Sequence, residues 1–155
     1  MVSLEQIDKQ TIRSLIYNVY ASDVDMQTKY HLLKGKSLEE MVDYTWEQSI
    51  SDEDKFDVRY YAIIYEGKQV GYTTLVFDKI GLLHTFGIKK QYRTEEVKDG
   101  WLKAVREIFG ELPYVLTLRK MNERAIGFFK KKGFESRLET NEETNEQYYL
   151  LWQQQ

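Results

Sequence analysis

The spacing of apolar positions divides the first third of the chain into two helical segments. Residues 5–20 and residues 38–50 carry apolar side chains at helical spacing, so both are expected to be amphipathic helices. Ser37 is a suitable cap for the second helix. The connection between them, residues 21–36, is polar and ends near Gly35.

The middle of the chain changes to patterns that are typical of strands. Residues 58–66 and 69–77 are rich in β-branched and aromatic side chains, and Gly67-Lys68 joins them. This pattern predicts a β-hairpin. Residues 81–88 predict a third strand.

The last third of the chain alternates between segments with helical spacing of apolar residues and segments with strand patterns. Apolar residues recur at helical spacing over 95–109, where Gly110 and Pro113 end the pattern. The remaining predicted elements are a strand at 114–119, a helix at 123–132, and two strands at 134–139 and 146–152 joined by a turn at 141–145. This order predicts one α/β (α+β) domain over residues 1–155, with a mixed, mostly antiparallel sheet flanked by helices.

Composition narrows the class of protein. A chain of 155 residues is long enough for one domain with a real core, and 42% hydrophobic with 30% charged residues is typical of a globular protein in water. No apolar run of membrane length and no signal-peptide pattern is present, so a cytoplasmic protein without membrane contact is expected. The absence of cysteine excludes disulfides, thiolate ligands and cysteine nucleophiles. His31 and His84 lie far apart, so no metal site is expected.

Charge is distributed unevenly along the chain. Residues 1–57 carry twelve acidic and six basic side chains, whereas residues 58–155 carry thirteen acidic and sixteen basic ones. A basic C-terminal part suits an anionic cofactor and an acidic N-terminal part suits an amine substrate, but an uneven solvated surface explains the same counts. Because the net charge is -3, no nucleic-acid partner is expected.

The segment Asn122 to Phe134 reads Asn-Glu-Arg-Ala-Ile-Gly-Phe-Phe-Lys-Lys-Lys-Gly-Phe. Asn122 is suited to cap a helix, and Gly133 is suited to the left-handed conformation that ends one. The order Asn-x-x-Ala, an aromatic pair and Gly-Phe resembles the C-terminal signature of the GCN5-related N-acetyltransferase family. The resemblance covers roughly residues 58–152. It also implies a first strand near residues 1–7, where only Val2 and Leu4 support one.

The family resemblance implies a cosubstrate, acetyl-CoA, and an acceptor that is a small-molecule amine or a peptide amine, with the protein acting as a monomer or homodimer. It continues at residues 88–98, where family members have Arg/Gln-x-x-Gly-x-Gly/Ala at the start of a helix. Backbone N–H groups there hold the CoA pyrophosphate. The cofactor-binding residues that the resemblance implies are Gly87, Ile88, Arg93, Thr94, Glu95, Glu96, Val97, Lys98, Asn122 and Phe129.

This loop departs from the family pattern. Arg93 matches the basic position and Val97 the apolar one, but Thr94, Glu96 and Lys98 stand where glycine or a small residue is usual. Glu95 and Glu96 put two carboxylates into the first helical turn. Their charge opposes an anionic ligand, although acidic residues in a first turn also complement the helix dipole.

The resemblance also indicates where catalytic groups are expected. In the family a backbone N–H on the strand before the loop, which a bulge splays open, polarises the thioester carbonyl. Here Gly87 is compatible with a bulge, and the amide of Ile88 or a neighbour is the candidate donor. His84 matches a histidine that relays a proton in some members, but it is also explained as a half-buried strand residue.

Phe129 occupies the position of a tyrosine that protonates the thiolate in many family members, and it lacks the hydroxyl. Tyr148 and Tyr149 on the last strand are candidates to replace it. Two hypotheses therefore stay open. The protein is an acetyl-CoA-dependent N-acetyltransferase, or it is a non-catalytic member of the fold that serves as a binding or scaffold module.

Overall fold

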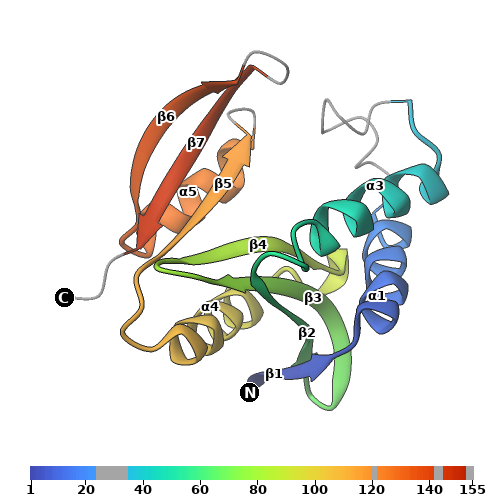
Figure 1. Cartoon of the computed structure of the whole chain (residues 1–155). Helices are drawn as coiled ribbons and strands as arrows, with labels where there is room; N and C mark the ends of the chain where they lie inside the picture. Colours follow the sequence, from blue (N-terminus) through green and yellow to red (C-terminus); the bar gives the residue numbers. More distant parts are fainter. Residues whose placement is uncertain (24–34, 120–121, 142–144, 153–155) are drawn as a thin grey trace.

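The computed structural model describes residues 1–23, 35–119, 122–141 and 145–152 (Figure 1). Arg119 and residues 136–141 and 145–152 are described by their backbone alone. The helical elements are α1 (Lys9–Ala21), α3 (Leu38–Ile50), the 3₁₀ turn η2 (Lys90–Tyr92), α4 (Glu95–Phe109) and α5 (Glu123–Lys131). The strands are β1 (Val2–Ile7), β2 (Asp57–Tyr65), β3 (Lys68–Phe77), β4 (Gly81–Ile88), β5 (Tyr114–Arg119), β6 (Glu135–Asn141) and β7 (Asn145–Trp152).

Within the described residues the seven strands form one sheet in the order β1-β2-β3-β4-β5-β7-β6. Neighbouring strands are antiparallel except β4 and β5, which are parallel. The predicted α/β class with a mixed, mostly antiparallel sheet is therefore confirmed. The predicted bounds of β4, α4 and β5 are those observed. His31, much of the connection 21–36 and the centre of the turn 141–145 lie outside the described residues.

The start of the chain corrects one prediction. Residues 5–7 are not helical but belong to β1, which pairs antiparallel with β2 in the register Leu4↔Ile63. Asp8 then caps α1, because its carboxylate accepts a hydrogen bond from Thr11 N–H at 2.7 Å. Apolar residues are few in this strand, so its place at the sheet edge beside β2, rather than its own pattern, decides its conformation.

The β2–β3 hairpin turns one residue earlier than predicted. Tyr65 pairs with Lys68, and the two residues between them, Glu66 and Gly67, have φ angles of 51° and 74°. Positive φ at both central residues defines a type I′ turn, whose twist matches that of the flanking strands. The predicted hairpin is confirmed with its turn at Glu66-Gly67.

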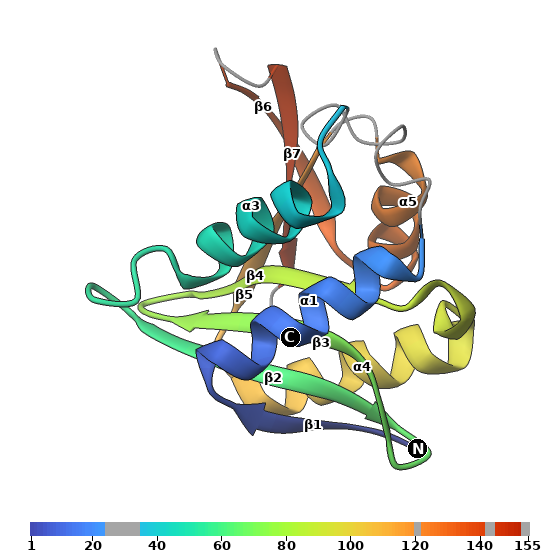
Figure 2. The same ribbon diagram turned by 90° about the vertical axis from the view of Figure 1, so that its right-hand side faces the viewer.

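The two faces of the sheet are covered by different helices (Figure 2). Helices α1 and α3 pack on one face, where the core includes Ile16, Val19, Met41 and Tyr72. Helices α4 and α5 pack on the other face, where Leu83, Ile88, Trp101, Leu102 and Phe129 are among the buried residues. Side chains of β2 alternate between the two cores: Tyr60 and Ala62 face α1 and α3, and Tyr61 and Ile63 face α4.

Strands β3 and β4 approach closely at the end of β4. A Cβ atom on Gly71 would lie 2.2 Å from the carbonyl oxygen of Gly87 and 3.1 Å from Cα of Ile88. A Cβ atom on Gly87 would lie 2.7 Å from Cε1 of Tyr72. Glycine at these positions therefore permits the approach that sets the path of β4 toward α4.

We expect Gly71→Ala to destabilise the fold by roughly 1–3 kcal/mol, because the new methyl group meets backbone atoms that cannot turn away. Gly127→Ala is the matched control. No atom lies within 4 Å of a Cβ there, and the residue is inside α5, so the change is expected to stabilise by about 0.5–1 kcal/mol. Urea unfolding of both variants checks the pair, and equal effects would contradict the close approach.

Candidate active site

Strands β4 and β5 part soon after they begin. They pair only at Gly81↔Tyr114 and Leu82↔Val115. From there β4 continues along β3 while β5 continues along β7, and Figure 1 shows the two strands diverging. Among the described residues, no strand pairs with Leu83–Ile88 on the edge that faces β5. The backbone polar groups of that edge are thus directed into the opening between the strands.

A bulge in β4 accompanies this separation. Thr74 pairs with Thr85 and the next residue, Leu75, pairs with Leu83, so His84 is the extra residue of β4. The bulge is therefore at His84 and not at Gly87, which pairs regularly with Tyr72. Glycine at position 87 is explained instead by the Tyr72 ring that lies across it.

The pairing of β3 and β4 decides which amides of β4 face the opening. Lys89 N–H donates to the Val70 carbonyl at 2.9 Å, on the β3 side. Because successive residues of a strand direct their N–H groups to opposite edges, Gly87 also faces β3, whereas Ile88 and Phe86 face the opening. The Ile88 amide, the predicted donor, thus faces the opening, and Phe86 is a second amide on the same edge; the role of Ile88 stays a prediction.

His84 lies against the end of α3. Its Nε2 is 2.5 Å from the Gln48 carbonyl oxygen and 3.3 Å from Ser51 Oγ. A carbonyl oxygen only accepts, so Nε2 carries the hydrogen and Nδ1 is the basic nitrogen of the neutral ring. Burial lowers the pKa of His84, opposed by the bond to Gln48 and by the charge of Asp52. Any base function of His84 therefore belongs to Nδ1.

The loop after β4 leads to the N-terminus of α4. Thr94 caps the helix, its Oγ1 accepting a hydrogen bond from Val97 N–H at 3.3 Å. The carboxylate of Glu96 accepts a hydrogen bond from Tyr65 OH on β2, and this bond raises the pKa of Tyr65 to about 12. Glu95 lies 3.5 Å from Lys98. Both first-turn carboxylates thus have a partner within the protein.

Arg93, expected to provide positive charge for the pyrophosphate, has protein partners as well. Its NH1 lies 2.6 Å from Oδ2 of Asp23, a carboxylate that is 1% exposed just after α1. Its Nε donates to the Ile88 carbonyl at 2.8 Å. Sequence reasoning missed Asp23 and Tyr65, because each lies far along the chain from the loop residue that it contacts.

Asn122 and Phe129 are placed by α5. Asn122 caps the helix, its Oδ1 accepting from Ala125 N–H at 3.4 Å. The Phe129 side chain is 1% exposed. Its ring centroid lies 5.2–6.1 Å from four other aromatic rings, those of Phe86, Trp101, Phe128 and Phe134. Position 129 is thus part of the aromatic core between α4, α5 and β4.

Trp101 is a further residue that sequence reasoning did not single out as a site residue. Its ring lies 4.9 Å from that of Phe86, centroid to centroid, and its buried Nε1 has no hydrogen-bond partner within the described part of the chain. A buried N–H donor without a partner is uncommon. Nothing in the residue order distinguishes it from a core tryptophan.

Tyr148 and Tyr149 lie on β7, which is separated from β4 by β5. Their backbones pair with Leu118 and Thr117 of β5, and their side chains lie outside the described part of the structure. The prediction that either tyrosine acts as an acid therefore stays a prediction.

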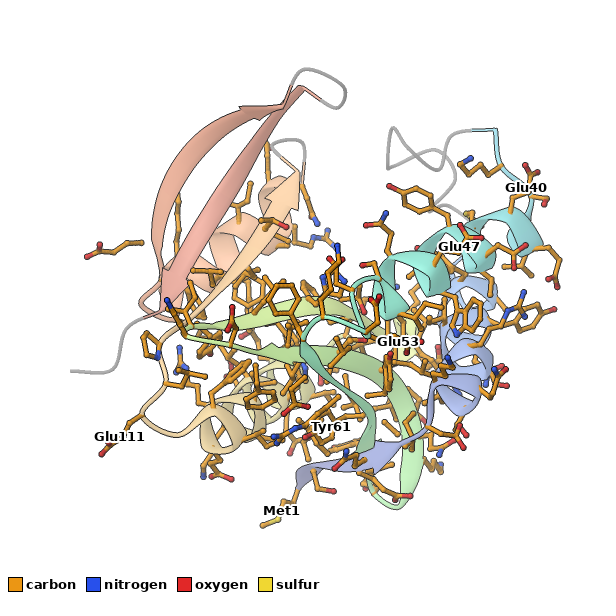
Figure 3. All side chains as sticks on the ribbon, viewed as in Figure 1. Met1, Glu40, Glu47, Glu53, Tyr61 and Glu111 are labelled. Atoms are coloured by element: carbon orange, nitrogen blue, oxygen red, sulfur yellow. The ribbon has the colours of Figure 1, made fainter. Side chains whose placement is uncertain are left out.

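Several acidic side chains of the N-terminal half form ion pairs with basic side chains of the same half. Arg13 contacts Asp43 and Glu39, and Lys9 contacts Glu53 at 2.7 Å. Figure 3 shows Glu40 and Glu47 along α3 and Glu53 in the turn that follows. Glu40 and Glu47 are both exposed, and Glu40 belongs to the capping box of α3 with Ser37. The net charge of this half stays negative, because it has twice as many acidic as basic side chains.

The described residues contain no helix that is long and apolar enough to cross a membrane. In the same part of the chain, no group of three or more histidine, cysteine, aspartate or glutamate side chains is placed to hold a metal ion.

Comparison with solved structures identifies the fold. An acetyltransferase from Salmonella typhimurium that modifies the N-terminal serine of ribosomal protein L7/L12 matches with a TM-score of 0.73 at 11% identity, over 99% of this chain and 95% of that one. AAC(6')-Ib in complex with paromomycin and acetyl-CoA matches with a TM-score of 0.73 at 14% identity, over 99% and 93%. The PaiA N-acetyltransferase from Thermoplasma acidophilum, in complex with coenzyme A, matches with a TM-score of 0.66 at 14% identity, over 98% and 99%.

No family model and no curated protein matches the sequence. The structural likeness nevertheless extends over almost the whole chain. The protein therefore has the fold of the GCN5-related N-acetyltransferases, as the sequence motifs predict.

Phe129→Tyr is expected to lower stability by roughly 1–3 kcal/mol, because it buries a hydroxyl among aromatic rings. Phe128→Tyr is the control: this ring is half-buried and lies beneath Lys98 Nζ, so a change within about 0.5 kcal/mol is expected. Urea unfolding measures both. A stable Phe129→Tyr variant that speeds thiol release from acetyl-CoA would show instead that position 129 opens to the reacting atoms.

His84 predicts a specific pH dependence of stability. Its pKa is lowered in the folded protein from an ordinary value of 6.5, so the unfolded chain binds more protons as the pH falls below that value. The free energy of unfolding should therefore decrease from about pH 6.5 downward, by at most about 1.4 kcal/mol per pH unit. Urea unfolding between about pH 7.5 and 5.5 should show a smaller decrease for His84→Gln than for the wild type. If the free energy of unfolding falls equally with pH in both proteins, His84 is not the group responsible.

Proposed function

We propose that this protein transfers the acetyl group of acetyl-CoA to a primary amine by direct attack of the amine. The observation that carries the proposal is the edge of β4, where the amides of Phe86 and Ile88 face the opening left by β5. The N-terminus of α4 follows within the same loop. Strand amides suit the developing charge of an acyl oxygen, and the helix N-terminus suits a pyrophosphate.

The residues of the loop support cosubstrate binding in spite of their departures from the family pattern. Among the described residues Thr94 Oγ1 accepts from the Val97 N–H, and the preceding N–H groups of the first turn, those of Glu95 and Glu96, are candidates to bind phosphate oxygens. Tyr65 holds the Glu96 carboxylate through a hydrogen bond from β2. Lys98 lies beside Glu95 and reduces the negative charge of the first turn. The proposed cosubstrate-binding residues also include Gly87, Ile88 and Asn122. Two other predicted residues, Arg93 and Phe129, act indirectly, through contacts with protein groups.

The proposed acetyl transfer uses one hydrogen-bond donor, one base and one acid from the protein. A bond forms between the acceptor nitrogen and the carbonyl carbon, the carbon–sulfur bond breaks, and the thiol leaves as a thiolate. The Ile88 N–H binds the carbonyl oxygen as negative charge develops. The amine proton passes to a base, for which Nδ1 of His84 is the candidate, and Tyr148 or Tyr149 is the candidate acid for the thiolate.

The acceptor that we propose is a small-molecule or peptide amine. The Salmonella relative modifies a protein's N-terminal serine, and AAC(6')-Ib is bound to paromomycin. Glu47 on α3 supplies an exposed carboxylate for a cationic group. We further propose that the protein acts in the cytoplasm, as a monomer or homodimer, without nucleic acid.

A second candidate function is supported by Phe129. Its side chain is sealed in the aromatic core and has no hydroxyl, so the usual thiolate acid of the family is missing. This observation favours a non-catalytic domain that binds CoA, or another ligand, as a module. Both functions predict that CoA binds, but only the acetyltransferase predicts turnover of acetyl-CoA.

We expect CoA and acetyl-CoA to stabilise the protein. At a ligand concentration of a hundred dissociation constants, the gain in free energy of unfolding is about 2.7 kcal/mol. Thermal unfolding with and without the ligand measures this gain. The absence of a shift with millimolar CoA, acetyl-CoA and longer acyl-CoA compounds would remove the cosubstrate from the proposal and also exclude a CoA-binding module.

Glu96→Gln is expected to strengthen CoA binding by up to about fivefold, since it removes a negative charge from the first turn of α4. Glu107→Gln is the matched control, because it makes the same change at an exposed position near the other end of this helix. Isothermal titration of CoA into each variant gives the two dissociation constants. Equal affinities would place the pyrophosphate away from the start of α4.

A further inference from the structure

The segment just after α1 is bonded to the loop that follows β4, and through Arg93 of that loop it is connected to the end of β4. Asp23, 1% exposed, lies 2.6 Å from Arg93 NH1, and the same guanidinium donates through Nε to the Ile88 carbonyl at 2.8 Å. One residue earlier, Ser22 Oγ accepts a hydrogen bond from Lys90 N–H at 3.0 Å. Two neighbouring residues thus contact two positions of the proposed cosubstrate loop, Lys90 and Arg93, and Arg93 connects them to Ile88.

These contacts hold the peptide that follows Ile88 on both of its sides. Lys89 N–H is bonded to the Val70 carbonyl on β3, while the Ile88 carbonyl of the same peptide is bonded to Arg93 on the opposite side. A guanidinium is planar and rigid, so one anchored nitrogen orients the other. Asp23 anchors NH1, and Nε then determines the orientation of the Ile88 peptide. The Ile88 N–H, one peptide earlier, is oriented with it.

We propose that Asp23 and Arg93 are positioning residues for acetyl transfer, which hold the backbone of Ile88 so that its N–H meets the carbonyl oxygen of the acetyl group. This inference rests on the proposed function. It assigns Arg93 a role that differs from the one its position in the motif implies. The guanidinium acts through Ile88, and its charge is balanced by Asp23 instead of by phosphate.

The two roles of Arg93 predict opposite results when Asp23 loses its charge. If Arg93 is a positioning residue, Asp23→Asn frees the guanidinium to turn away from Ile88, and the rate of transfer falls while the affinity for CoA is unchanged. If Arg93 is a phosphate ligand, the same change releases a positive charge next to the pyrophosphate. CoA then binds more tightly and the rate at saturating acetyl-CoA is unchanged.

Arg93→Lys separates the roles in a second way. Lysine keeps the positive charge but cannot bond Asp23 and Ile88 at once with a planar group. A positioning role predicts that this variant is as slow as Asp23→Asn, whereas a phosphate role predicts retained affinity and rate. Asp43→Asn is the control, because Asp43 pairs with Arg13 on the exposed faces of α1 and α3. It should change neither quantity.

The test measures thiol release from saturating acetyl-CoA with paromomycin or a peptide with an N-terminal serine as acceptor, and CoA affinity by isothermal titration. The chain contains no cysteine, so the thiol reagent meets no background from the protein. We expect Asp23→Asn and Arg93→Lys to lose about ten- to a hundredfold in rate. All variants are assayed below their melting temperatures, which circular dichroism determines.

A further measurement does not depend on activity. In the ligand-free protein, amide hydrogen exchange at Lys89 and Lys90 should be faster in Asp23→Asn than in the wild type, and exchange in α3 should be unchanged. Unchanged exchange together with an unchanged rate would overturn the positioning role while the proposed function stands. A wild-type protein that neither binds CoA nor transfers acetyl groups would overturn the proposed function itself, and the positioning role of Asp23 with it.

Discussion

The structure depends on one constraint, which is that β4 keeps its pairing with β3 along its length and its pairing with β5 over two residues only. Two separate cores cover the sheet, because α1 and α3 pack on one face and α4 and α5 pack on the other. The bulge at His84 bends β4 where the separation begins. The Ile88 and Phe86 amides face the opening as a result, and the start of α4 follows at the end of the same strand.

The loop between β4 and α4 and the first turn of α4 show how charged residues are accommodated near a helix N-terminus. Three of these charges have partners within the protein: Glu96 with Tyr65, Arg93 with Asp23, and Glu95 with Lys98. The partners come from β2, from the end of α1 and from α4 itself. These charges are thus tied to the scaffold, and in the proposed function the backbone N–H groups at the start of α4 are the principal donors for a pyrophosphate.

Phe129 has a role in packing but lacks a group that could act in catalysis. Its ring packs the junction of α4, α5 and β4 through contacts with Phe86, Trp101, Phe128 and Phe134. The hydroxyl that would protonate a leaving thiolate is absent. In the proposed function the thiolate is a fair leaving group and the amide donors on β4 bind the carbonyl oxygen of the thioester, so transfer without this acid is chemically reasonable.

The sequence by itself determined the order of the elements, because local periodicity and caps are recorded in neighbouring residues. The helix over 95–109, the caps Ser37 and Asn122 and the hairpin after β2 were all predicted in this way. The family motifs further indicated the fold and the loop. The pairing of β1 with β2, the position of the bulge, and the pairing of Asp23 with Arg93 were decided only by the tertiary structure. Each of these depends on contacts between segments far apart in the chain, and the periodicity of a single segment carries no information about its distant partner.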